Sequence, residues 1–598
     1  MYTYGVYKKK GAESMDPIKV DFTKKSDQGP DKKTGVVIPP EKKGLKIVIN
    51  LLLTAVFGAV LYYFLLPAFN FKSILMYAFL GALCVFYCIV NYVTSGALKT
   101  PDYAPYARKS TLVPKILIGV LLAVVAVGFI VSSVVFRASS YAEIIDVQTG
   151  DFAQEVDEAD FSSVPVIDEA TTAVLAQRAV SDLDKLGYVS QFDIQPNYFQ
   201  INYKDSPVRV VPLQYSNIIK WLTNAKNGLP AYVIVDARTQ EAELVEVKGG
   251  MKYSTADHFN DNVIRHVRFN YPTYLLDTPT FEIDEEGHPY WIFAKLDMTI
   301  GLFGGRDVTG AIICDSVTGE CKEYSIEEIR TKEELQWIDR IYSAELLNEQ
   351  YNFFGRYQGG FWNSILSQKN TYSTTEDYSY LAINDDVYMY TGVTSLTNDE
   401  SITGFILINQ RTKEAKYYVM SGAKEASAQA SAQGLVQQYE YTASFPLLLN
   451  IDGVPTYFMS LKDASSLVKG YAMINVGQYT LGTTGSTLEE CINNYVKVLS
   501  DNNIKVSVNT DGIDENMGSA GSNTEEKLTA TGVITDIRTA VVNGNSVYYI
   551  KLDSADCYYS VKAADAENIV LVNKGDEVTF TITTDEGSII PASALEVK

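Results

Sequence analysis

A serine and a lysine stand at the spacing of a known nucleophile pair. Ser466 and Lys469 fit the Ser-x-x-Lys pattern, in which the amine takes up the hydroxyl proton so that the oxygen can attack an electrophilic carbon. Enzymes that use this pair also bring a Lys-Thr-Gly motif to the same site. The Lys-Thr-Gly of this chain, at 33–35, is separated from Ser466 by three long apolar segments. We therefore interpret the Ser466 pattern as a coincidence.

The histidines and carboxylates are the other candidate catalytic or metal-binding groups. Their spacing does not indicate an active site or a metal site either. His258 and His266 are eight residues apart in one expected helix, so they cannot form the i, i+4 pair of a zinc protease, and His288 is isolated. Acidic pairs such as Asp385 and Asp386 fall in expected turns, and the sequence does not show how far apart they lie in a cleft. The sequence therefore predicts no catalytic residue, no metal site and no cofactor, and it leaves weak binding of a divalent cation open. An envelope hydrolase with an unidentified carboxylate site stays open as an alternative.

One strand–turn–strand pattern occurs three times between residues 201 and 505. An apolar strand leads into Asp/Asn-x-x-Thr-x-Glu, and a strand of alternating residues follows. The copies are Tyr232–Val247, Ala311–Ile326 and Phe405–Met420. The Asp or Asn can accept a hydrogen bond from the backbone two residues on, so we expect it to form a tight turn and not to act in catalysis. Helical patterns follow each copy, which predicts repeated antiparallel sheets packed by helices.

Two cysteines flank the turn of the middle copy. Cys314 and Cys321 stand symmetrically about it, so we expect them to face each other across the hairpin. The corresponding positions of the other copies hold apolar residues, Val235 with Ala242 and Ile408 with Ala415. We therefore favour two packed thiols over a disulfide and leave their oxidation open.

The middle copy resembles the hairpin of PepSY-type domains, which are small secreted or membrane-tethered α+β modules associated with peptidase regulation and envelope binding. The resemblance covers 16 residues in each copy, and only the middle copy has a glycine, Gly319, after the Thr. The wider exterior region is similar to uncharacterised membrane-anchored proteins of Gram-positive, clostridia-like bacteria. The resemblance implies a location at the cell envelope and, as one alternative, inhibition or regulation of a membrane-associated peptidase.

Two further regions flank the repeats. A juxtamembrane segment, 137–200, contains an expected helix that begins after Asp168. Residues 506–526 are rich in Asn, Asp, Gly, Ser and Thr and are typical of a linker. Beyond the linker, 527–598 reads as five short strands, including one at 569–572 and a hairpin at Asn543-Gly544, which predicts a small OB-like β-barrel.

Aromatic side chains are the candidate binding residues. Tyr290 and Trp291 follow a turn of the repeat region and are expected to be exposed, where they could anchor a partner. Tyr548 and Tyr549 of the distal module could stack on a base or a sugar. Residues 525–598 carry six Lys/Arg against twelve Asp/Glu, however, and such a module repels phosphate, so nucleic acid is disfavoured.

Three long stretches contain no charged side chain and predict transmembrane helices. They are 47–71, 73–98 and 116–136, each long enough to cross the hydrocarbon core of about 30 Å. None contains Asp, Glu, Lys, Arg or His, the groups that proton relays and ion pathways commonly need. The sequence therefore disfavours transport.

The flanking charges predict the orientation. Residues 1–46 form a tail with eleven lysines, the loop after the first stretch has only Lys72, and four of the residues between the second and third stretches are Lys or Arg. The positive-inside rule then places the amino terminus in the cytoplasm and residues 137–598 outside. The tail lysines also predict contact with anionic membrane lipid.

The chain as a whole predicts an α+β membrane protein. Its 598 residues exceed one domain, and a hydrophobic content of 46% with 20% charged residues excludes a disordered polymer. We expect a multi-pass, non-enzymatic binding or scaffold protein of the bacterial cell envelope. Its repeated modules would recognise a protein or peptide partner, in part by adding a strand to an open sheet edge. Whether it forms a homo-oligomer is left open.

Overall fold

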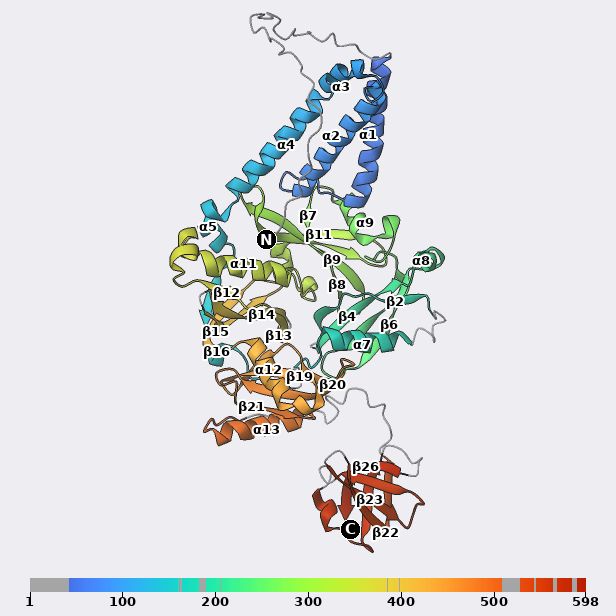
Figure 1. The fold of residues 1–598 in the computed structure, drawn as a ribbon, viewed down its shortest axis with the longest axis vertical. Coiled ribbons are helices and arrows are strands. Elements are labelled where there is room, and N and C mark those ends of the chain that lie inside the picture. Colours follow the sequence, from blue (N-terminus) through green and yellow to red (C-terminus); the bar gives the residue numbers. More distant parts are fainter. Residues whose placement is uncertain are drawn as a thin grey trace, which may run out of the picture. The chain divides into compact units, whose positions relative to one another are not determined.

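The structure is a computed structural model of the whole chain (Figure 1). It describes residues 42–597 apart from 160, 162–163, 182–189, 205, 384–385, 397, 508–527, 543–544, 563–566 and 583–588. Most of the basic tail, most of the linker at 506–526, and the Asn543-Gly544 turn lie outside the described residues.

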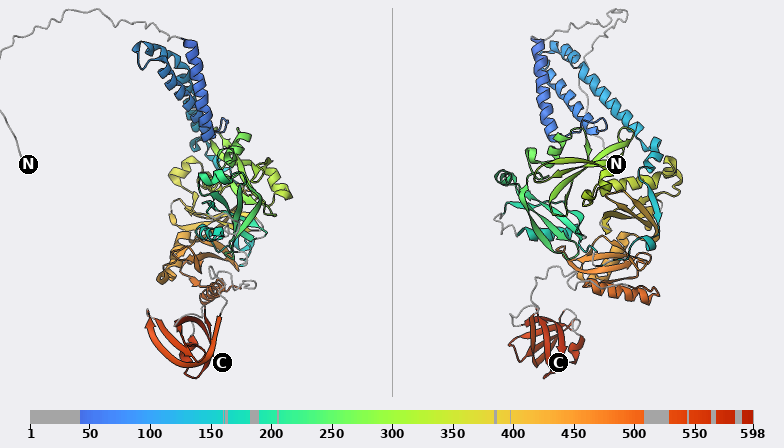
Figure 2. Two further views of the ribbon diagram at one scale, coloured as in Figure 1. Left: turned by 90° about the vertical axis from the view of Figure 1, so that its right-hand side faces the viewer. Right: turned by 180° about the vertical axis from the view of Figure 1, so that it is seen from behind.

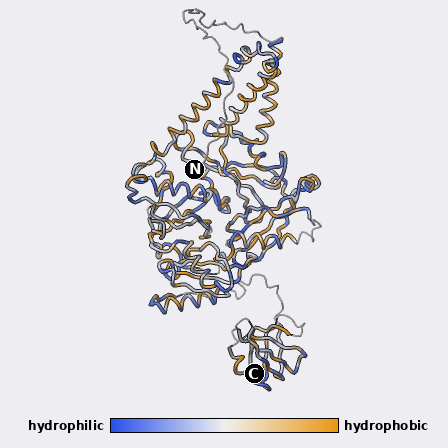
Figure 3. The backbone as a smooth tube through the Cα atoms, in the orientation of Figure 1, coloured by the Kyte–Doolittle hydropathy of each residue, from blue (hydrophilic) through white to orange (hydrophobic). Residues whose placement is uncertain are grey.

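Three helices near the amino terminus are long and apolar enough to cross a membrane. They are α1 (Lys43–Leu65), α2 (Ile74–Ser95) and α4 (Leu112–Val131), with the short helices η1 (Pro101–Tyr103) and α3 (Ala104–Ser110) between the last two. Their apolar composition is visible along most of their length in Figure 3. The first helix ends at Leu65 because Pro67 lacks the N–H that a further turn would need.

Polar and aromatic contacts join α1 to α2. Asn50 Nδ2 donates to Asn91 Oδ1 at 3.2 Å, and Thr94 Oγ1 donates to Asn50 Oδ1 at 2.8 Å. The rings of Phe57 and Phe86 stack with centroids 4.0 Å apart. Amide pairs of this kind hold transmembrane helices together because lipid offers them no other partner.

Four antiparallel sheets with one common strand order follow. In each sheet the first two strands pair with the third, and the third, fourth and fifth strands pair in succession. The first sheet contains β2 (Phe192–Ile194), β3 (Phe199–Tyr203), β4 (Ser206–Tyr215), β5 (Leu229–Asp236) and β6 (Ala242–Met251). The second contains β7 (Leu275–Leu276), β8 (Thr280–Ile283), β9 (Pro289–Ile300), β10 (Gly304–Asp315) and β11 (Cys321–Ser325).

The third and fourth sheets repeat this order. The third contains β12 (Tyr372–Thr374), β13 (Ser379–Ile383), β14 (Asp386–Ser395), β15 (Asn398–Asn409) and β16 (Ala415–Ala423). The fourth contains β17 (Thr442–Ala443), β18 (Leu447–Ile451), β19 (Val454–Lys462), β20 (Val468–Asn475) and β21 (Gly482–Gly485). One added strand, β1 (Val147–Gly150), pairs in parallel with the outer edge of β16.

The turns between the fourth and fifth strands of the first three sheets have one hydrogen-bond pattern. Oδ1 of Asp236, Asp315 or Asn409 accepts from the backbone N–H groups two and three residues on, at 2.7–3.0 Å. The residue after the Thr has a positive φ in each turn, at Gln240, Gly319 and Lys413. These polar side chains therefore form the turns, as their spacing indicated.

Helices cover the sheets, and shared cores join the sheets into one body. The helices after α4 are α5 (Val134–Ala142), α6 (Phe152–Glu155), α7 (Glu169–Ala179), α8 (Ile218–Asn224), α9 (Val263–Asn270), α10 (Ile326–Thr331), α11 (Ala344–Tyr357), α12 (Glu425–Leu435) and α13 (Leu488–Asp501). One hydrophobic core takes buried residues from all four sheets, and a second takes them from the second and third sheets and α11. Figure 2 shows the sheets from two further sides.

The carboxyl-terminal residues form a closed five-stranded barrel with its own core. Its strands are β22 (Leu528–Val542), β23 (Asn545–Leu552), β24 (Tyr558–Lys562), β25 (Glu577–Ile582) and β26 (Ile589–Val597), and they close in the order β22-β23-β24-β26-β25. The strand expected at 569–572 is wrong, because these residues belong largely to the 3-10 helix η7 (Glu567–Leu571). The fifth strand is instead β26.

Candidate binding groove

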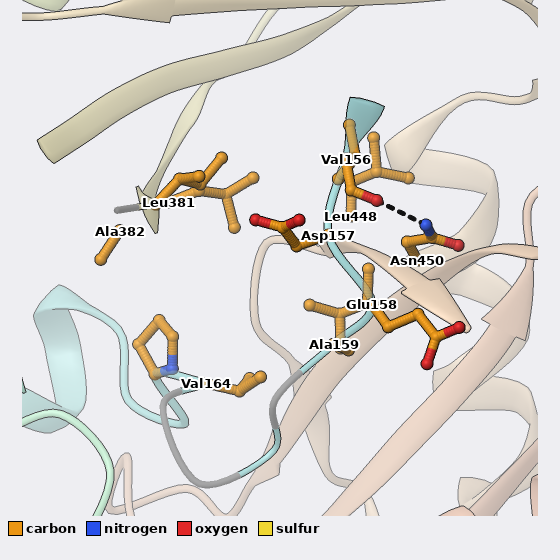
Figure 4. A pocket seen from close by; sticks show the side chains of 12 residues that line it. Val156, Asp157, Glu158, Ala159, Val164, Leu381, Ala382, Leu448 and Asn450 are labelled. Carbon is orange, nitrogen blue, oxygen red and sulfur yellow. Dashed lines mark hydrogen bonds between the residues drawn. The ribbon is translucent and has the colours of Figure 1, made fainter. Parts of the chain in front are cut away.

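A groove opens between two short strands of different sheets, β13 and β18. Its volume is about 230 Å³. Leu381 and Ala382 of β13 line one side, and Leu448 and Asn450 of β18 line the other (Figure 4). The extended segment 156–159 completes the wall beside β18. The lining of the groove is therefore largely apolar, and the groove lies between the edges of β13 and β18.

The hairpin geometry of β13 directs both backbone polar groups of one residue, Ala382, toward this groove. Ile383 and Asp386 flank a two-residue loop, so they form a hydrogen-bonded pair, and Ala382 opposite Val387 is the next, non-hydrogen-bonded pair. In agreement, the Val387 carbonyl turns away and accepts from Gln410 N at 2.9 Å. The N–H and C=O of Ala382 therefore point out of the sheet. Among the described residues neither group has a hydrogen-bond partner.

The equivalent positions of two other sheets are covered. β3 and β18 end in the same two-residue hairpin, and the residues that correspond to Ala382 are Asn202 and Asn450. Asn202 N donates to Asp339 Oδ2 at 2.5 Å, and the Asn450 carbonyl accepts from Ala159 N at 2.9 Å. Because buried backbone groups are nearly always paired, the open edge of Ala382 is the exception among the three hairpins.

The opposite wall carries negative charge. Segment 156–159 is held by Asn450, whose Nδ2 donates to the Val156 carbonyl at 2.6 Å. Asp157 and Glu158 lie between these anchors and are exposed. Figure 4 shows the Asp157 carboxylate pointing toward Leu381 across the groove, and the Glu158 carboxylate pointing away from it. A cationic group above the β13 edge would therefore face Asp157.

Strand addition already occurs within this chain. Residues 147–150 of β1 pair in parallel with 415–418 of β16, so this sheet edge accepts an extended segment from elsewhere in the sequence. The corresponding edge of the first sheet, at Leu244 and Glu246 of β6, pairs with no other strand in the described part of the chain.

The predicted aromatic anchors are not brought together. Trp291 is only 1% exposed, and its Nε1 donates to the Tyr253 carbonyl at 3.1 Å, so the expectation that it is exposed is wrong. Neighbouring residues on a strand face opposite sides, and Tyr290 is half-buried on the other face. The Tyr290 ring lies 5.0 Å from that of Trp337, in a second cavity of about 500 Å³.

Burial of the Tyr290 side chain, followed by the nearby charge of Asp284, raises the pKa of the Tyr290 hydroxyl.

Tyr548 and Tyr549 are neighbours on β23, in the separate barrel, where both are half-buried. Tyr548 packs partly against the barrel core.

The lysine of the Ser-x-x-Lys pattern lies beside a carboxylate. Lys469 Nζ lies 3.6 Å from Asp463 Oδ2, and Ser466 occupies a turn with φ of 60°. The chain also contains a Ser-Asp-Asn triplet at 500–502, which the sequence interpretation missed. It lies at the carboxyl end of α13.

Cys314, Cys321 and a histidine from α9 form a cluster of reactive side chains. Cys314 and Cys321 are opposite each other on β10 and β11, as expected, with their sulfurs 2.9 Å apart. Ligand atoms of both cysteines and of His266 lie within 4.8 Å of one another. Hydrogen bonding from Cys314 and then from His266 lowers the pKa of the Cys321 thiol, whereas the same sulfur contact and burial raise that of Cys314. Sequence reasoning missed His266 because it comes from a distant helix.

Comparison with known proteins assigns no family. No protein-family model matches the chain, and no curated protein matches it. A solved structure that it resembles weakly is an exo-β-1,3-galactanase from Phanerochaete chrysosporium, determined with β-1,3-galactotriose. The two chains are 7% identical, with a TM-score of 0.14 over 59% of this chain and 55% of the galactanase chain. A likeness at this level shows neither a shared fold nor a shared activity.

Proposed function

We propose that this chain is a non-enzymatic, membrane-anchored binding protein whose exterior captures an extended peptide segment of an envelope protein. The observation that carries the proposal is the open β13 edge at Ala382, which faces a groove while the equivalent edges at Asn202 and Asn450 are covered. An added strand would gain main-chain hydrogen bonds from Ala382, and apolar side chains of that strand would enter the floor beside Leu381 and Leu448. Asp157 would favour a segment with Lys or Arg.

Several features support the setting of this function. Three apolar helices precede the sheets, and the lysines flanking them favour a cytoplasmic amino terminus with residues 137–598 outside. The common strand order of the four sheets supports one repeated α+β module, in line with the PepSY-like resemblance. The barrel order β22-β23-β24-β26-β25, with η7 between its third and fourth strands, supports an OB-like module.

The test removes the outward N–H of β13 without disturbing its hairpin. Ala382→Pro deletes a donor that β14 does not use, and the ring blocks an incoming strand. Full-length protein in detergent would be screened against an array of random hexapeptides. The selected peptides would then be measured on both forms by fluorescence anisotropy. We expect Ala382→Pro to weaken their binding about tenfold or more, because at least one hydrogen bond and the close backbone approach are lost.

Two variants serve as controls. Ala382→Val keeps the N–H and should bind the selected peptides with nearly unchanged affinity. Asp157→Asn should weaken mainly the peptides that contain Lys or Arg. Equal affinity of the wild type and Ala382→Pro for every selected peptide would rule out the groove, and so would an array that yields no peptide.

A further inference from the structure

Three potential metal ligands meet in the second sheet, on the face that packs toward α9. Cys314 ends β10, Cys321 begins β11, and His266 lies in α9, nearly fifty residues earlier in the chain. Cys314 is fully buried, whereas Cys321 and His266 are half-buried. Within the described residues, this is the group of three His, Cys, Asp or Glu side chains whose ligand atoms all lie within 4.8 Å of one another.

From this geometry we infer that His266, Cys314 and Cys321 bind a thiophilic cation of the Zn²⁺ class. Two thiolates and an imidazole are the ligands that Zn²⁺ prefers, and sites with three protein ligands keep a fourth position for water. Cys321 and His266 are partly exposed, so that water would bind on their side of the cluster. This inference is independent of the peptide-binding groove.

The histidine makes the kind of backbone hydrogen bond that metal-binding histidines usually make. His266 Nε2 lies 2.8 Å from the Gly319 carbonyl, to which its N–H donates. In this tautomer the lone pair is on Nδ1, so metal binding through Nδ1 would keep the Gly319 hydrogen bond. Hydrogen bonds of this kind fix the tautomer of metal-binding histidines. The Tyr253 ring packs against the imidazole, with its centroid 4.5 Å from that of His266.

The second hairpin differs from the first and third at several positions that form this site. Gly319 has a φ of +76°, and a Cβ there would lie 2.4 Å from the Tyr253 ring. The other two turns hold Gln240 and Lys413 at this position, and their strands hold Val, Ile and Ala in place of the cysteines. The glycine, the cysteine pair and the histidine thus occur together in one copy of three. A requirement for packing alone does not explain this combination, because apolar pairs fill the same positions elsewhere.

Small side-chain movements are enough to admit the ion. Two sulfurs bound to one Zn²⁺ at about 2.3 Å with a tetrahedral angle lie about 3.8 Å apart. The sulfurs of Cys314 and Cys321 are 2.9 Å apart. Rotation of the half-buried Cys321 side chain away from Cys314 would open this gap. The same short contact also favours oxidation to a disulfide, so the experiment must separate the two outcomes.

The test measures Zn²⁺ binding to the full-length protein, purified in detergent under reducing conditions. Competition with a chromophoric chelator gives the affinity, and Co²⁺ substitution shows thiolate ligation through its charge-transfer absorption. We expect one more Zn²⁺ equivalent on the wild type than on the double variant Cys314→Val/Cys321→Ala. This variant carries the residue pair of the first hairpin and should therefore fold. His266→Gln should weaken binding by more than about 100-fold, the upper end of the cost of losing an outer-shell partner.

A matched control separates a metal site from a simple dithiol. Val235→Cys/Ala242→Cys, made in the double-variant background, places the same thiol pair on the first hairpin. The helix that packs there, α7, contains no histidine. This control should bind Zn²⁺ as weakly as His266→Gln. Equal Zn²⁺ binding by the wild type and Cys314→Val/Cys321→Ala would overturn the inference. So would a Cys314–Cys321 disulfide, found by alkylation and mass spectrometry, that re-forms in the presence of Zn²⁺.

Discussion

Among single residues, a buried acid outside the groove departs clearly from ordinary side-chain chemistry. Asp257 is 4% exposed and accepts hydrogen bonds from Trp221 Nε1 at 3.0 Å and from Ser254 Oγ at 2.7 Å. Burial raises the pKa of the Asp257 carboxyl to about 7, although both hydrogen bonds act in the opposite direction. The folded protein therefore holds a proton that the unfolded chain releases near pH 4.

This proton makes stability depend on pH with a definite sign. Between about pH 4 and about pH 7 the unfolded state binds fewer protons than the folded state, so the free energy of unfolding falls as pH rises. Asp257→Asn cannot ionise and should lose this dependence. Urea unfolding of both proteins at about pH 4.5 and about pH 7.5 should show the wild type losing about 3 kcal/mol relative to the variant. If the free energy of unfolding changes with pH by the same amount in both proteins, ionisation of Asp257 is not the cause of the change.

At the scale of helices and strands, the sequence predicts features formed by neighbouring residues. It does not predict features formed by segments that are far apart in the chain. The turns at Asp236, Asp315 and Asn409 could be predicted because every interaction in them spans about six residues. The groove could not, because its walls come from 156–159, β13 and β18. Nor does strand alternation say which face of a strand a neighbouring sheet covers, which is why Trp291 was expected to be exposed. For the same reason, the sequence did not indicate that His266 lies beside the paired cysteines.

The turn of the second hairpin gives a prediction at this scale. Gly319→Ala adds a Cβ where φ is +76° and where the Tyr253 ring is only 2.4 Å away. The positive φ should cost about 1 kcal/mol and the overlap about 1–3 kcal/mol more. Gly360→Ala is the matched control, because Gly360 has a φ of +83° but no atom within 4 Å of the added Cβ. Urea unfolding should therefore show a clearly larger loss for Gly319→Ala, and equal losses would mean that Tyr253 simply moves aside.

In the molecule as a whole, the loop between the first two apolar helices lies against the second sheet. Lys72 Nζ contacts Asp297 Oδ1 at 2.7 Å, Phe69 N donates to the Pro272 carbonyl at 2.8 Å, and Asn70 Nδ2 donates to that of Thr273 at 3.0 Å. These contacts support a loop on the same side of the membrane as the sheets. The lysine distribution independently favours the same arrangement, because this loop has a single lysine whereas the next one is basic.

Cysteine labelling on intact cells tests this arrangement. Phe71→Cys, in the first loop, replaces a side chain that is 76% exposed, and Leu98→Cys, between the second and third apolar helices, replaces one that is 72% exposed. If the first loop is outside and the second inside, a membrane-impermeant maleimide should label residue 71 before lysis and residue 98 only after it, because the reagent cannot cross the bilayer. Mass spectrometry of the labelled peptides separates these two sites from the six native cysteines. Labelling of residue 98 on intact cells, with residue 71 protected, would invert the topology. The groove and the cysteine–histidine cluster would then lie in the cytoplasm, and an envelope partner would be excluded.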